Sequence, residues 1–537
     1  MRRFGTQGRV YPEENYVVLR TEELVDFINR VKDGKYIVLF APRQTGKTTF
    51  FRWALEALAT EDATYFPIQL DFQVVRNTSS DTFYQRFSRM MFKEIGNVFD
   101  KRGNTPSEAF SQFLENTRLT DDFSLIEFFE DLGGFLNNQR IVLIIDEFDG
   151  IPRSIVGDFL YALRHIYLSG KPRCPHSVSI IGVKSIAQLD YDRSVSPFNI
   201  QDEFRLPNFT LEQVRELLGQ YTDEIGQAFA PEVIESIYRQ TAGQPVLVNR
   251  FAQILTEELD IPKTETITMG HFAIAHTQLL RGRNTNIEHL TTNIRRNRRF
   301  ESVLMRIMAR DEGVDFNLDD DIISELATYG VIKEGTDGMC EVLNPIYLYR
   351  ILRLFKPTVN GLEQEYFPED ADDERHEYLT PTGQIEMTSL LDNFRDFIAR
   401  AGYRILQVPD TPQESVRRHL LLAYLDEFVR RVGGMMHIEV QTGRGRMDLI
   451  LTHNHRKYIV ETKVWRGDRR YQAGKKQLAA YLELEGATEG YYVVFDHRQV
   501  PESRIEMETL EGILIRSYII PVVQEVPSGV SDQRTET

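Results

Sequence analysis

A short stretch near the N-terminus has the residue types and spacing of phosphate chemistry. Gly46, Lys47 and Thr48 follow the apolar run "KYIVLF" and precede an amphipathic segment, which places them between a predicted strand and a predicted helix. Backbone N–H groups at a helix N-terminus bind phosphate, a lysine reaches the β- and γ-phosphates, and a hydroxyl ligates Mg²⁺. We therefore expect ATP and Mg²⁺ at a loop made of Ala41, Pro42, Arg43, Gln44, Thr45, Gly46, Lys47, Thr48 and Thr49.

This loop departs from the usual P-loop pattern at one position. The pattern G-x-x-x-x-G-K-[ST] opens with glycine, and Ala41 stands there in this chain. Because the phosphates are bound through backbone N–H groups around Gly46, the side chain at residue 41 is not needed for binding. We expect the substitution to be tolerated.

A second stretch supplies carboxylates that suit the same chemistry. The run "IVLIIDEFDG" places five apolar residues, 141–145, directly before Asp146 and Glu147. Ligands bind at the carboxyl ends of parallel strands in open α/β sheets. Asp146 is predicted to hold Mg²⁺ through water, and Glu147 to polarise the attacking water. A buried strand that ends in polar residues would explain this run alone, but its combination with the loop favours nucleotide hydrolysis.

Five segments of the N-terminal part resemble a known family. "YVVLRTEELVDFI", "APRQTGKTTFF", "LIIDEFD", "SPFNI" and "GQPVLVNRFAQIL" are similar to the AAA-like ATPases of prokaryotes, near the archaeal-type and STAND-like branch of P-loop NTPases. The resemblance covers roughly residues 10–355. It implies that Gly243 and Pro245 of a helical lid approach the nucleotide.

The resemblance also implies a polar sensor residue and an arginine finger, neither of which the sequence identifies clearly. Lys184 and Ser185 in "IIGVKS" occupy the region of the sensor. Arg193 and Arg205 are the finger candidates. For each arginine the alternative is a solvated or salt-bridged side chain, which is the commoner role of a surface arginine.

The C-terminal part carries a second constellation, in "GRGRMDLILTHNHRKYIVETKVW". Alternate residues of a strand share a face, so Glu461 and Lys463 project together, and a hairpin through "THNHRK" would bring Asp448 beside Glu461. Carboxylates among apolar strand residues are costly to bury unless a cation pairs with them. Two carboxylates on Mg²⁺ with a nearby lysine would suit phosphodiester hydrolysis. The alternative is an exposed Glu–Lys pair on an edge strand.

This region resembles the PD-(D/E)XK nuclease superfamily, whose active site is D…E-x-K. The resemblance assigns Asp448 and Glu461 to Mg²⁺ and Lys463 to the attacking water. Glu414 falls where the family places a helix glutamate, and "QLAAY" reproduces the Q-x-x-x-Y element of a RecB-like subgroup. The implied catalytic set is Glu414, Asp448, Glu461, Lys463, Gln477 and Tyr481.

Local charge supports a nucleic-acid partner for this region. The whole chain has a net charge of −17, which argues against nonspecific coating of nucleic acid. Residues 415–480, however, contain fourteen Lys/Arg against six Asp/Glu. We expect DNA to bind this basic region. Trp465 and Tyr471 are candidates for stacking on bases, with core packing as the alternative for Trp465.

Hydrophobic patterning predicts an α/β fold in several domains, because 537 residues exceed what one core usually supports. In the segment after the lid, the aspartates of "DDDIISELATYG" would repel phosphates, which favours a structural role over groove reading. The predicted domains are a P-loop parallel-sheet core (1–210), a helical lid (211–290), a winged helix (291–358), an acidic linker (359–384), a restriction-endonuclease-like α/β domain (385–525) and a flexible tail (526–537).

Composition narrows the setting. Cys174 and Cys340 are the only cysteines, which argues against a disulfide framework or a Cys-built zinc site and predicts a cytoplasmic protein. No apolar run approaches the roughly 18 residues of a membrane span, so we expect no membrane partner. A homo-oligomer is compatible with the sequence.

The sequence therefore predicts an ATPase whose nucleotide state governs a C-terminal Mg²⁺-dependent nuclease. Two alternatives stay open. One is an ATP-dependent signalling or scaffold protein that keeps the nuclease fold as a binding module. The other is a motor that translocates DNA.

Overall fold

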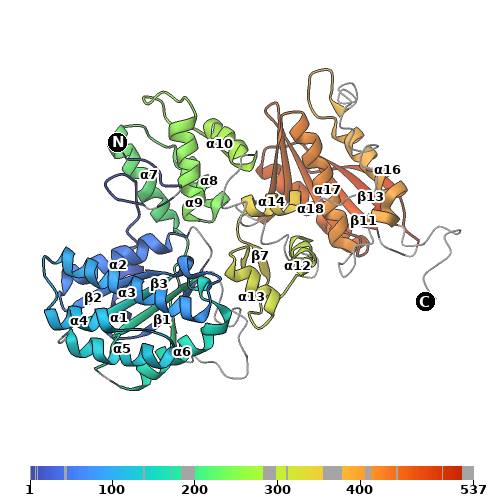
Figure 1. Cartoon of the computed structure of the whole chain (residues 1–537). Coiled ribbons are helices and arrows are strands. Elements are labelled where there is room, and N and C mark those ends of the chain that lie inside the picture. The colour runs from blue at the N-terminus through green and yellow to red at the C-terminus, as the bar shows by residue number, and fades with distance from the viewer. Residues whose placement is uncertain are drawn as a thin grey trace, which may run out of the picture. The chain divides into compact units, whose positions relative to one another are not determined.

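The computed structural model forms two compact units, made of residues 1–279 with 319–331 and of residues 280–318 with 332–537 (Figure 1). Each unit is described by itself. The structure describes residues 2–6, 8, 10–41, 45–136, 139–170, 172–182, 200–281, 298–309, 313–354, 378–405, 413–442, 445–496, 498 and 500–522.

A five-stranded parallel sheet forms the centre of the first unit. Its strand order is β2-β3-β4-β1-β5. The strands are β1 (Tyr36–Phe40), β2 (Tyr65–Asp71), β3 (Arg140–Asp146), β4 (Ser177–Gly182) and β5 (Gln201–Glu203). Residues 141–146 of β3 and all of β4 are buried, as expected for strands covered on both faces. This sheet confirms the predicted α/β fold of the N-terminal part.

Helices cover both faces of this sheet because successive strand residues point to opposite sides. On one face, α1 and α2 pack their phenylalanines against Ile37, Leu39 and Ile144. On the other face, α3, α5 and α6 pack against Val38, Leu143 and their neighbours. The helices are α1 (Thr21–Lys32), α2 (Lys47–Glu61), α3 (Ser80–Lys101), α4 (Glu108–Asn116), α5 (Asp122–Phe135) and α6 (Arg153–Leu168), with short 3₁₀ turns η1 (Phe72–Val75) and η2 (Phe148–Gly150).

Four further helices follow β5, as the periodicity predicts for a helical lid. They are α7 (Leu211–Ile225), α8 (Pro231–Thr241), α9 (Pro245–Gln253), which continues into the π-helical turn η4 (Ile254–Glu258), and α10 (Met269–Arg281). Thr210 caps α7, since its hydroxyl accepts the N–H of Gln213. Pro231 and Pro245 each open a helix, where a missing N–H costs nothing.

The segment predicted as one winged helix has the expected elements but is divided between the two units. In order they are α12 (Arg298–Ala309), α13 (Asp321–Thr328), β6 (Ile332–Glu334), β7 (Cys340–Val342) and α14 (Pro345–Leu354). Residues 319–331, which include α13, group with the first unit, whereas the other elements group with the second. Within the second unit α12 and α14 pack against α17, which explains their grouping there. Asp320 caps α13 by accepting two backbone N–H groups, a structural role for the acidic stretch.

A six-stranded mixed sheet forms the centre of the second unit, in the order β12-β13-β11-β10-β9-β8. β10, β11 and β13 run parallel, and the other neighbours are antiparallel. The strands are β8 (Met435–Thr442), β9 (Gly445–His453), β10 (Arg456–Val464), β11 (Glu489–Asp496), β12 (Arg504–Leu510) and β13 (Ile513–Pro521), and the helices of this region are α16 (Met387–Ile405), α17 (Gln413–Arg431) and α18 (Asp468–Leu484). The strands β12 and β13 were not predicted from the sequence.

The stretch predicted as an acidic linker is structured at its C-terminal end. From residue 378 onward the chain packs on the β9–β10 hairpin: Asn454 donates to the carbonyl of Gly383, and the Tyr458 hydroxyl accepts the N–H of Ile385. Residues 359–377 lie outside the described residues, as does the predicted tail. The second unit therefore includes residues assigned to the linker, because their turn pairs with the hairpin.

Candidate functional site

The phosphate loop leads from β1 into α2, as predicted. Gly46 caps α2 with φ 86° and ψ 13°, a left-handed conformation that favours glycine although the space around it is open. Lys47 is 7% exposed, and its Nζ donates to the carbonyl oxygen of Ala41 at 2.6 Å. Pro42, Arg43 and Gln44 lie outside the described residues. The helix N-terminus and the buried lysine together suit an anion.

Thr48 and Asp146 meet although the sequence separates them by 98 residues. The Thr48 hydroxyl donates to Asp146 Oδ2 at 2.8 Å. Burial raises the pKa of Asp146 above its usual value, although the hydroxyl of Thr48 and the N–H of Glu147 oppose that rise. A hydroxyl and a buried carboxylate are oxygen ligands of the kind that Mg²⁺ takes beside phosphates. These two side chains therefore fit a Mg²⁺ ion brought by a nucleotide.

Glu147 follows in a constrained turn. Its backbone has φ 51° and ψ 45°, and its N–H donates to Asp146 Oδ1 at 2.9 Å. A left-handed non-glycine residue costs conformational energy and often lies at a functional site. Asp71 ends β2 directly beside Asp146 in the strand register. Sequence reasoning missed Asp71, although an apolar strand that ends in aspartate was also the signal for Asp146.

Arg20 is a second residue that sequence reasoning missed. Its guanidinium donates to the carbonyl oxygens of Pro207 at 2.8 Å and Thr45 at 3.3 Å, and its Cζ lies 4.7 Å from the centre of the Phe209 ring. Burial lowers the pKa of Arg20 to about 10. This side chain joins the phosphate loop to the start of the lid. The sequence signal is faint, since an arginine before the Thr-Glu-Glu of α1 has no distinctive spacing.

The predicted lid residues lie at a tight turn between α8 and α9. Gly243 has φ 67°, and a Cβ there would lie 1.9 Å from the carbonyl oxygen of Phe209. The N–H of Phe209 donates back to the carbonyl of Gly243 at 2.8 Å. Only glycine fits this approach. Pro245 is buried at the first position of α9.

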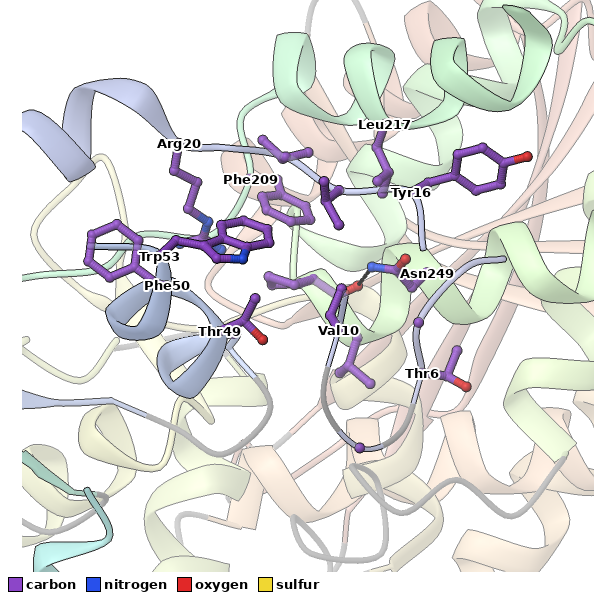
Figure 2. Close-up of a pocket in the computed structure, with 17 residues that line it drawn as sticks. Thr6, Val10, Tyr16, Arg20, Thr49, Phe50, Trp53, Phe209, Leu217 and Asn249 are labelled. Atoms are coloured by element: carbon purple, nitrogen blue, oxygen red, sulfur yellow. Dashed lines mark hydrogen bonds between the residues drawn. The ribbon is translucent and has the colours of Figure 1, made fainter. Parts of the chain in front are cut away.

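A cavity of about 170 Å³ is lined by residues of both the phosphate helix and the lid (Figure 2). Gly46 and Thr49 line it from the phosphate-loop side, and Pro245 and Asn249 line it from the lid. Aromatic and aliphatic side chains form much of the remaining wall: Val10, Tyr16, Val18, Phe50, Trp53, Phe209, Leu217 and Val246. Three predicted site residues, Gly46, Thr49 and Pro245, thus line one cavity, which Arg20 also lines.

The predicted sensor and finger residues stay untested. Lys184, Ser185 and Arg193 lie outside the described residues. The Arg205 side chain is 78% exposed, and its Nε lies 3.1 Å from the Glu203 carboxylate. This surface ion pair corresponds to the alternative role considered for that arginine.

In the second unit, Glu461 and Lys463 form an ion pair on one face of β10. Lys463 Nζ lies 2.7 Å from Glu461 Oε1, and the glutamate is 2% exposed. The antiparallel register of β9 and β10 runs to the pair Leu449 with Val460, so the next residues of the two strands are Asp448 and Glu461. The side chains of Asp448 and Glu414 lie outside what the structure describes. The predicted approach of Asp448 to Glu461 therefore stays a prediction.

The predicted helix pair on α18 is also joined. Gln477 Nε2 donates to the Tyr481 hydroxyl at 2.9 Å. A cavity beside β10 is lined by Lys463, Val464, Trp465, Arg466, Arg470, Tyr471, Tyr492 and Val494. Trp465 lies under Arg498, whose Cζ is 4.8 Å from the indole centre. The surroundings of Lys463 are therefore cationic and aromatic.

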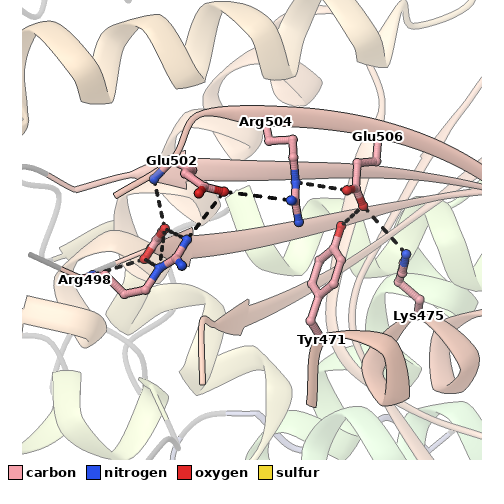
Figure 3. Close-up of polar contacts among 7 residues, drawn as sticks. Tyr471, Lys475, Arg498, Glu502, Arg504 and Glu506 are labelled. Carbon is pink, nitrogen blue, oxygen red and sulfur yellow. Dashed lines mark hydrogen bonds and ion pairs between the residues drawn. The ribbon is translucent and has the colours of Figure 1, made fainter. Parts of the chain in front are cut away.

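Some of the lysines counted in residues 415–480 pair with carboxylates that lie outside that range. Figure 3 shows part of a network in which the buried Lys475 reaches β12, where its Nζ lies 2.5 Å from Glu508 and 3.7 Å from Glu506. Lys457 likewise pairs with Glu485 at 2.9 Å. These partners lie beyond residue 480, so a count over 415–480 leaves out the carboxylates that neutralise them. At least two of the fourteen cations in that count are thus paired with carboxylates outside it.

Among the residues that the structure describes, no group of three or more His, Cys, Asp or Glu side chains is arranged to hold a metal ion. The side chains of Asp448 and Glu414 are not among those described. None of the helices in the described part of the chain is long and apolar enough to cross a membrane.

Two family models match different stretches of the chain, and the first of them reaches into the second unit. Residues 9–351 match a family model described as an AAA-like domain, and residues 384–499 match one described as a domain of unknown function, DUF8371. An uncharacterized WD repeat-containing protein of Synechocystis is 23% identical over 242 residues, which cover 44% of this chain. That match spans only 19% of the relative's own length.

Structural comparison finds partial likenesses to several solved structures. A Walker-type ATPase of Pyrococcus abyssi has a TM-score of 0.46 at 14% identity, covering 65% of this chain and 99% of that chain. Cdc6p of Pyrobaculum aerophilum has a TM-score of 0.36 at 12% identity, covering 78% and 97%. The RuvB Holliday junction branch migration motor of Thermotoga maritima has a TM-score of 0.32 at 15% identity, covering 60% and 90%. The AAA-like family model matches well over half of the residues of this chain. The chain therefore belongs to the AAA-like domain family of P-loop ATPases.

Proposed function

We propose that the chain binds and hydrolyses ATP at the phosphate loop, and that its nucleotide state regulates a Mg²⁺-dependent nuclease in the second unit. The observation that carries the first part is the 2.8 Å contact between Thr48 and Asp146, which joins the two halves of the predicted nucleotide site. Family membership supports the same activity.

Each residue of this site has a distinct role in the proposal. Lys47 leaves the carbonyl oxygen of Ala41 and binds the β- and γ-phosphates. Thr48 and Asp146 hold Mg²⁺, which neutralises charge that develops on the phosphates during transfer. Glu147, at the carboxyl end of β3, orients the attacking water and accepts its proton.

The nuclease part of the proposal rests on Glu461 and Lys463. A glutamate that is 2% exposed, paired with a lysine at 2.7 Å and next to Asp448 in the strand order, suits a carboxylate metal site with a lysine at hand. Arg466 and Arg470 line the same cavity as Lys463, where a phosphate backbone would be attracted. Nucleic acid, in the form of DNA, is the proposed substrate, and the protein is proposed to work in the cytoplasm.

Cleavage assays test this proposal. Labelled linear and circular DNA are incubated with Mg²⁺ and wild type, Lys463→Ala or Lys457→Ala, each with and without ATP, and ATP hydrolysis is measured in parallel. Lys457→Ala is the matched control, because this lysine lies on the same strand but pairs with Glu485 at the surface. We expect cleavage to be lost only in Lys463→Ala and to change with ATP in the wild type.

The other outcomes distinguish the alternatives. ATP hydrolysis without cleavage of either DNA would leave the second unit as a binding module in a signalling or scaffold protein. Hydrolysis that rises steeply with DNA length, without cutting, would favour the translocating motor. Cleavage that Lys463→Ala retains would contradict the assigned catalytic residue.

A further inference from the structure

The strand β12 lies at one end of the six-stranded sheet, and no strand in the described part of the chain pairs with its outer edge. It pairs with β13 without a bulge, from Arg504 opposite Ile519 to Leu510 opposite Ile513. Its seven residues include no proline, lysine or glycine. A regular edge of this length offers a row of backbone N–H and C=O groups to another strand.

The other edge strands of the two large sheets each have a feature that hinders pairing. In the first unit, β2 contains Pro67, which lacks a backbone N–H, and β5 has only three residues. In the second unit, β8 packs against α14 and α17. Among the described elements, the one that packs most extensively on β12 is its neighbour β13. The edge of β12 is therefore the least protected of the four.

One face of β12 carries charges that are already paired within the chain. Glu506 accepts a hydrogen bond from the Tyr471 hydroxyl at 2.6 Å, and Arg504 Nε lies 2.9 Å from the same carboxylate (Figure 3). Glu508 lies 2.5 Å from the buried Lys475. These carboxylates therefore repel an approaching strand less than unpaired carboxylates would.

The opposite face of β12 is uncharged and exposed. Alternate residues of a strand share a face, so Ile505, Met507 and Thr509 lie together. Met507 is 66% exposed and Ile505 is 43% exposed. Single exposed apolar residues are common, but two of them on one face of an unprotected edge favour burial against a further strand.

The sequence of β12 is complementary to itself in one antiparallel register. With Glu506 at the centre, Arg504 lies opposite Glu508 of a second copy, and Ile505 lies opposite Met507. A two-fold axis repeats both pairs. Opposite charges and apolar side chains stabilise a sheet when they form cross-strand pairs. The two Glu506 side chains meet at the axis, but each keeps the donors described above.

A shift of the register loses this complementarity. With Met507 at the centre, Glu506 would lie opposite Glu508 on both sides of the axis. Like charges that lie directly opposite each other destabilise a strand pair. The pattern of charges therefore favours one register and a second copy of the same strand.

We propose that two copies of this chain associate through β12, which pairs with β12 of the second copy in the antiparallel register centred on Glu506. The association joins two six-stranded sheets into one continuous sheet and covers Ile505 and Met507 of both copies. This inference goes beyond the proposed function and does not depend on ATP hydrolysis or DNA cleavage.

Sedimentation velocity of the full chain over a range of concentrations, without nucleotide, tests the association. We expect the wild type to form dimers as the concentration rises. Met507→Lys should raise the dissociation constant at least about tenfold, because each interface would gain two lysines that face isoleucine. Val500→Lys is the matched control, since Val500 is 81% exposed but lies outside the strand, and it should keep the wild-type constant. Thermal unfolding checks that both variants are folded.

Cysteine cross-linking tests the register. In the proposed register, residue 505 of one copy faces residue 507 of the other, whereas the two residues 507 are offset along the strands beyond the reach of a disulfide. Ile505→Cys and Met507→Cys are oxidised separately and as a mixture. We expect a disulfide-linked dimer in the mixture. The separate samples report the background from the native Cys174 and Cys340.

Three results would overturn the inference. A wild type that stays monomeric at every concentration would show that β12 does not pair with a second copy. Equal dissociation constants for the wild type and Met507→Lys would place the association on another surface. Cross-linking as strong in a separate sample as in the mixture would contradict the register centred on Glu506.

Discussion

Thr48 and Asp146 lie 98 residues apart in the chain, whereas Glu461 and Lys463 lie two residues apart on one strand. The first contact exists only because β1 and β3 belong to one parallel sheet whose carboxyl ends meet at one edge. The second arises in any strand with Glu-x-Lys, since alternate residues share a face. A contact between residues far apart in the chain is therefore stronger support for a functional site than a contact between residues close in the chain.

The two sites differ in how many segments of the chain contribute to them, and mutations can test this difference. The nucleotide site can be broken from several distant segments, because the phosphate helix, β3, Arg20 and the lid turn all contribute to it. The Glu461–Lys463 site depends on one strand and on partners whose side chains are outside the described residues. Four variants, in separate parts of the chain, test this difference.

Replacing Lys47 should have the largest effect. In Lys47→Ala, ATP hydrolysis should fall by at least about 100-fold, because the main cationic contact to the transferred phosphate is removed. Phosphate release with saturating ATP measures this. Lys463→Ala is the control and should hydrolyse ATP at the wild-type rate. The proposed coupling would be contradicted if ATP still altered DNA cleavage by Lys47→Ala.

The lid turn should tolerate no side chain. Gly243→Ala would place a Cβ 1.9 Å from the carbonyl of Phe209 at φ 67°, and we expect it to destabilise the first unit by about 3 kcal/mol. Thermal unfolding measures the loss. Gly219→Ala is the control, since Gly219 lies within α7 with open space around it and should gain up to about 1 kcal/mol. Equal stability of the two variants would contradict the tight turn.

Acid should weaken the second unit through Asp496. Burial raises the pKa of this carboxyl, but hydrogen bonds from the Arg498 guanidinium and from backbone N–H groups of Glu502 and Arg498 outweigh it and hold the pKa below its usual value. A depressed folded pKa stabilises the protein above the unfolded pKa of about 3.9, and this contribution is lost as the pH falls through the folded value.

Asp496→Asn should therefore be less stable than the wild type at pH 7, by about 1 kcal/mol, and the gap should close below about pH 4. Thermal unfolding at a series of pH values measures the gap. Glu502→Gln is the control, because it keeps the backbone N–H that Asp496 accepts. A gap that stays constant at low pH would rule out this linkage.

Arg205 should have the smallest effect. Its side chain is 78% exposed and pairs with Glu203, so Arg205→Ala should change ATP hydrolysis by less than about twofold. Hydrolysis rates over a range of protein concentrations measure this, with Arg215→Ala as another exposed control. A large loss that appears only at high concentration would instead identify an arginine finger acting between copies.

Much of the fold follows from the sequence because period-two and helical apolar patterns mark strands and helices directly. This applies to the strands of the first sheet before residue 183 and to the hairpin at Asn454 and His455. The hairpin of β12 and β13 was missed, although "RIEMETL" alternates in exposure. Its charged residues face Tyr471 and Lys475 of α18, so they resemble a solvated strand in the sequence.

The residue types and spacing of Gly46, Lys47, Thr48 and Asp146 are enough to predict a site for phosphate and Mg²⁺. What surrounds these residues depends on the folded chain. Arg20 joins the phosphate loop to the segment that precedes the lid, and Lys475 pairs with glutamates of a later strand. The physical reason is that spacing encodes neighbours along the chain, whereas burial and pairing depend on segments brought together by packing.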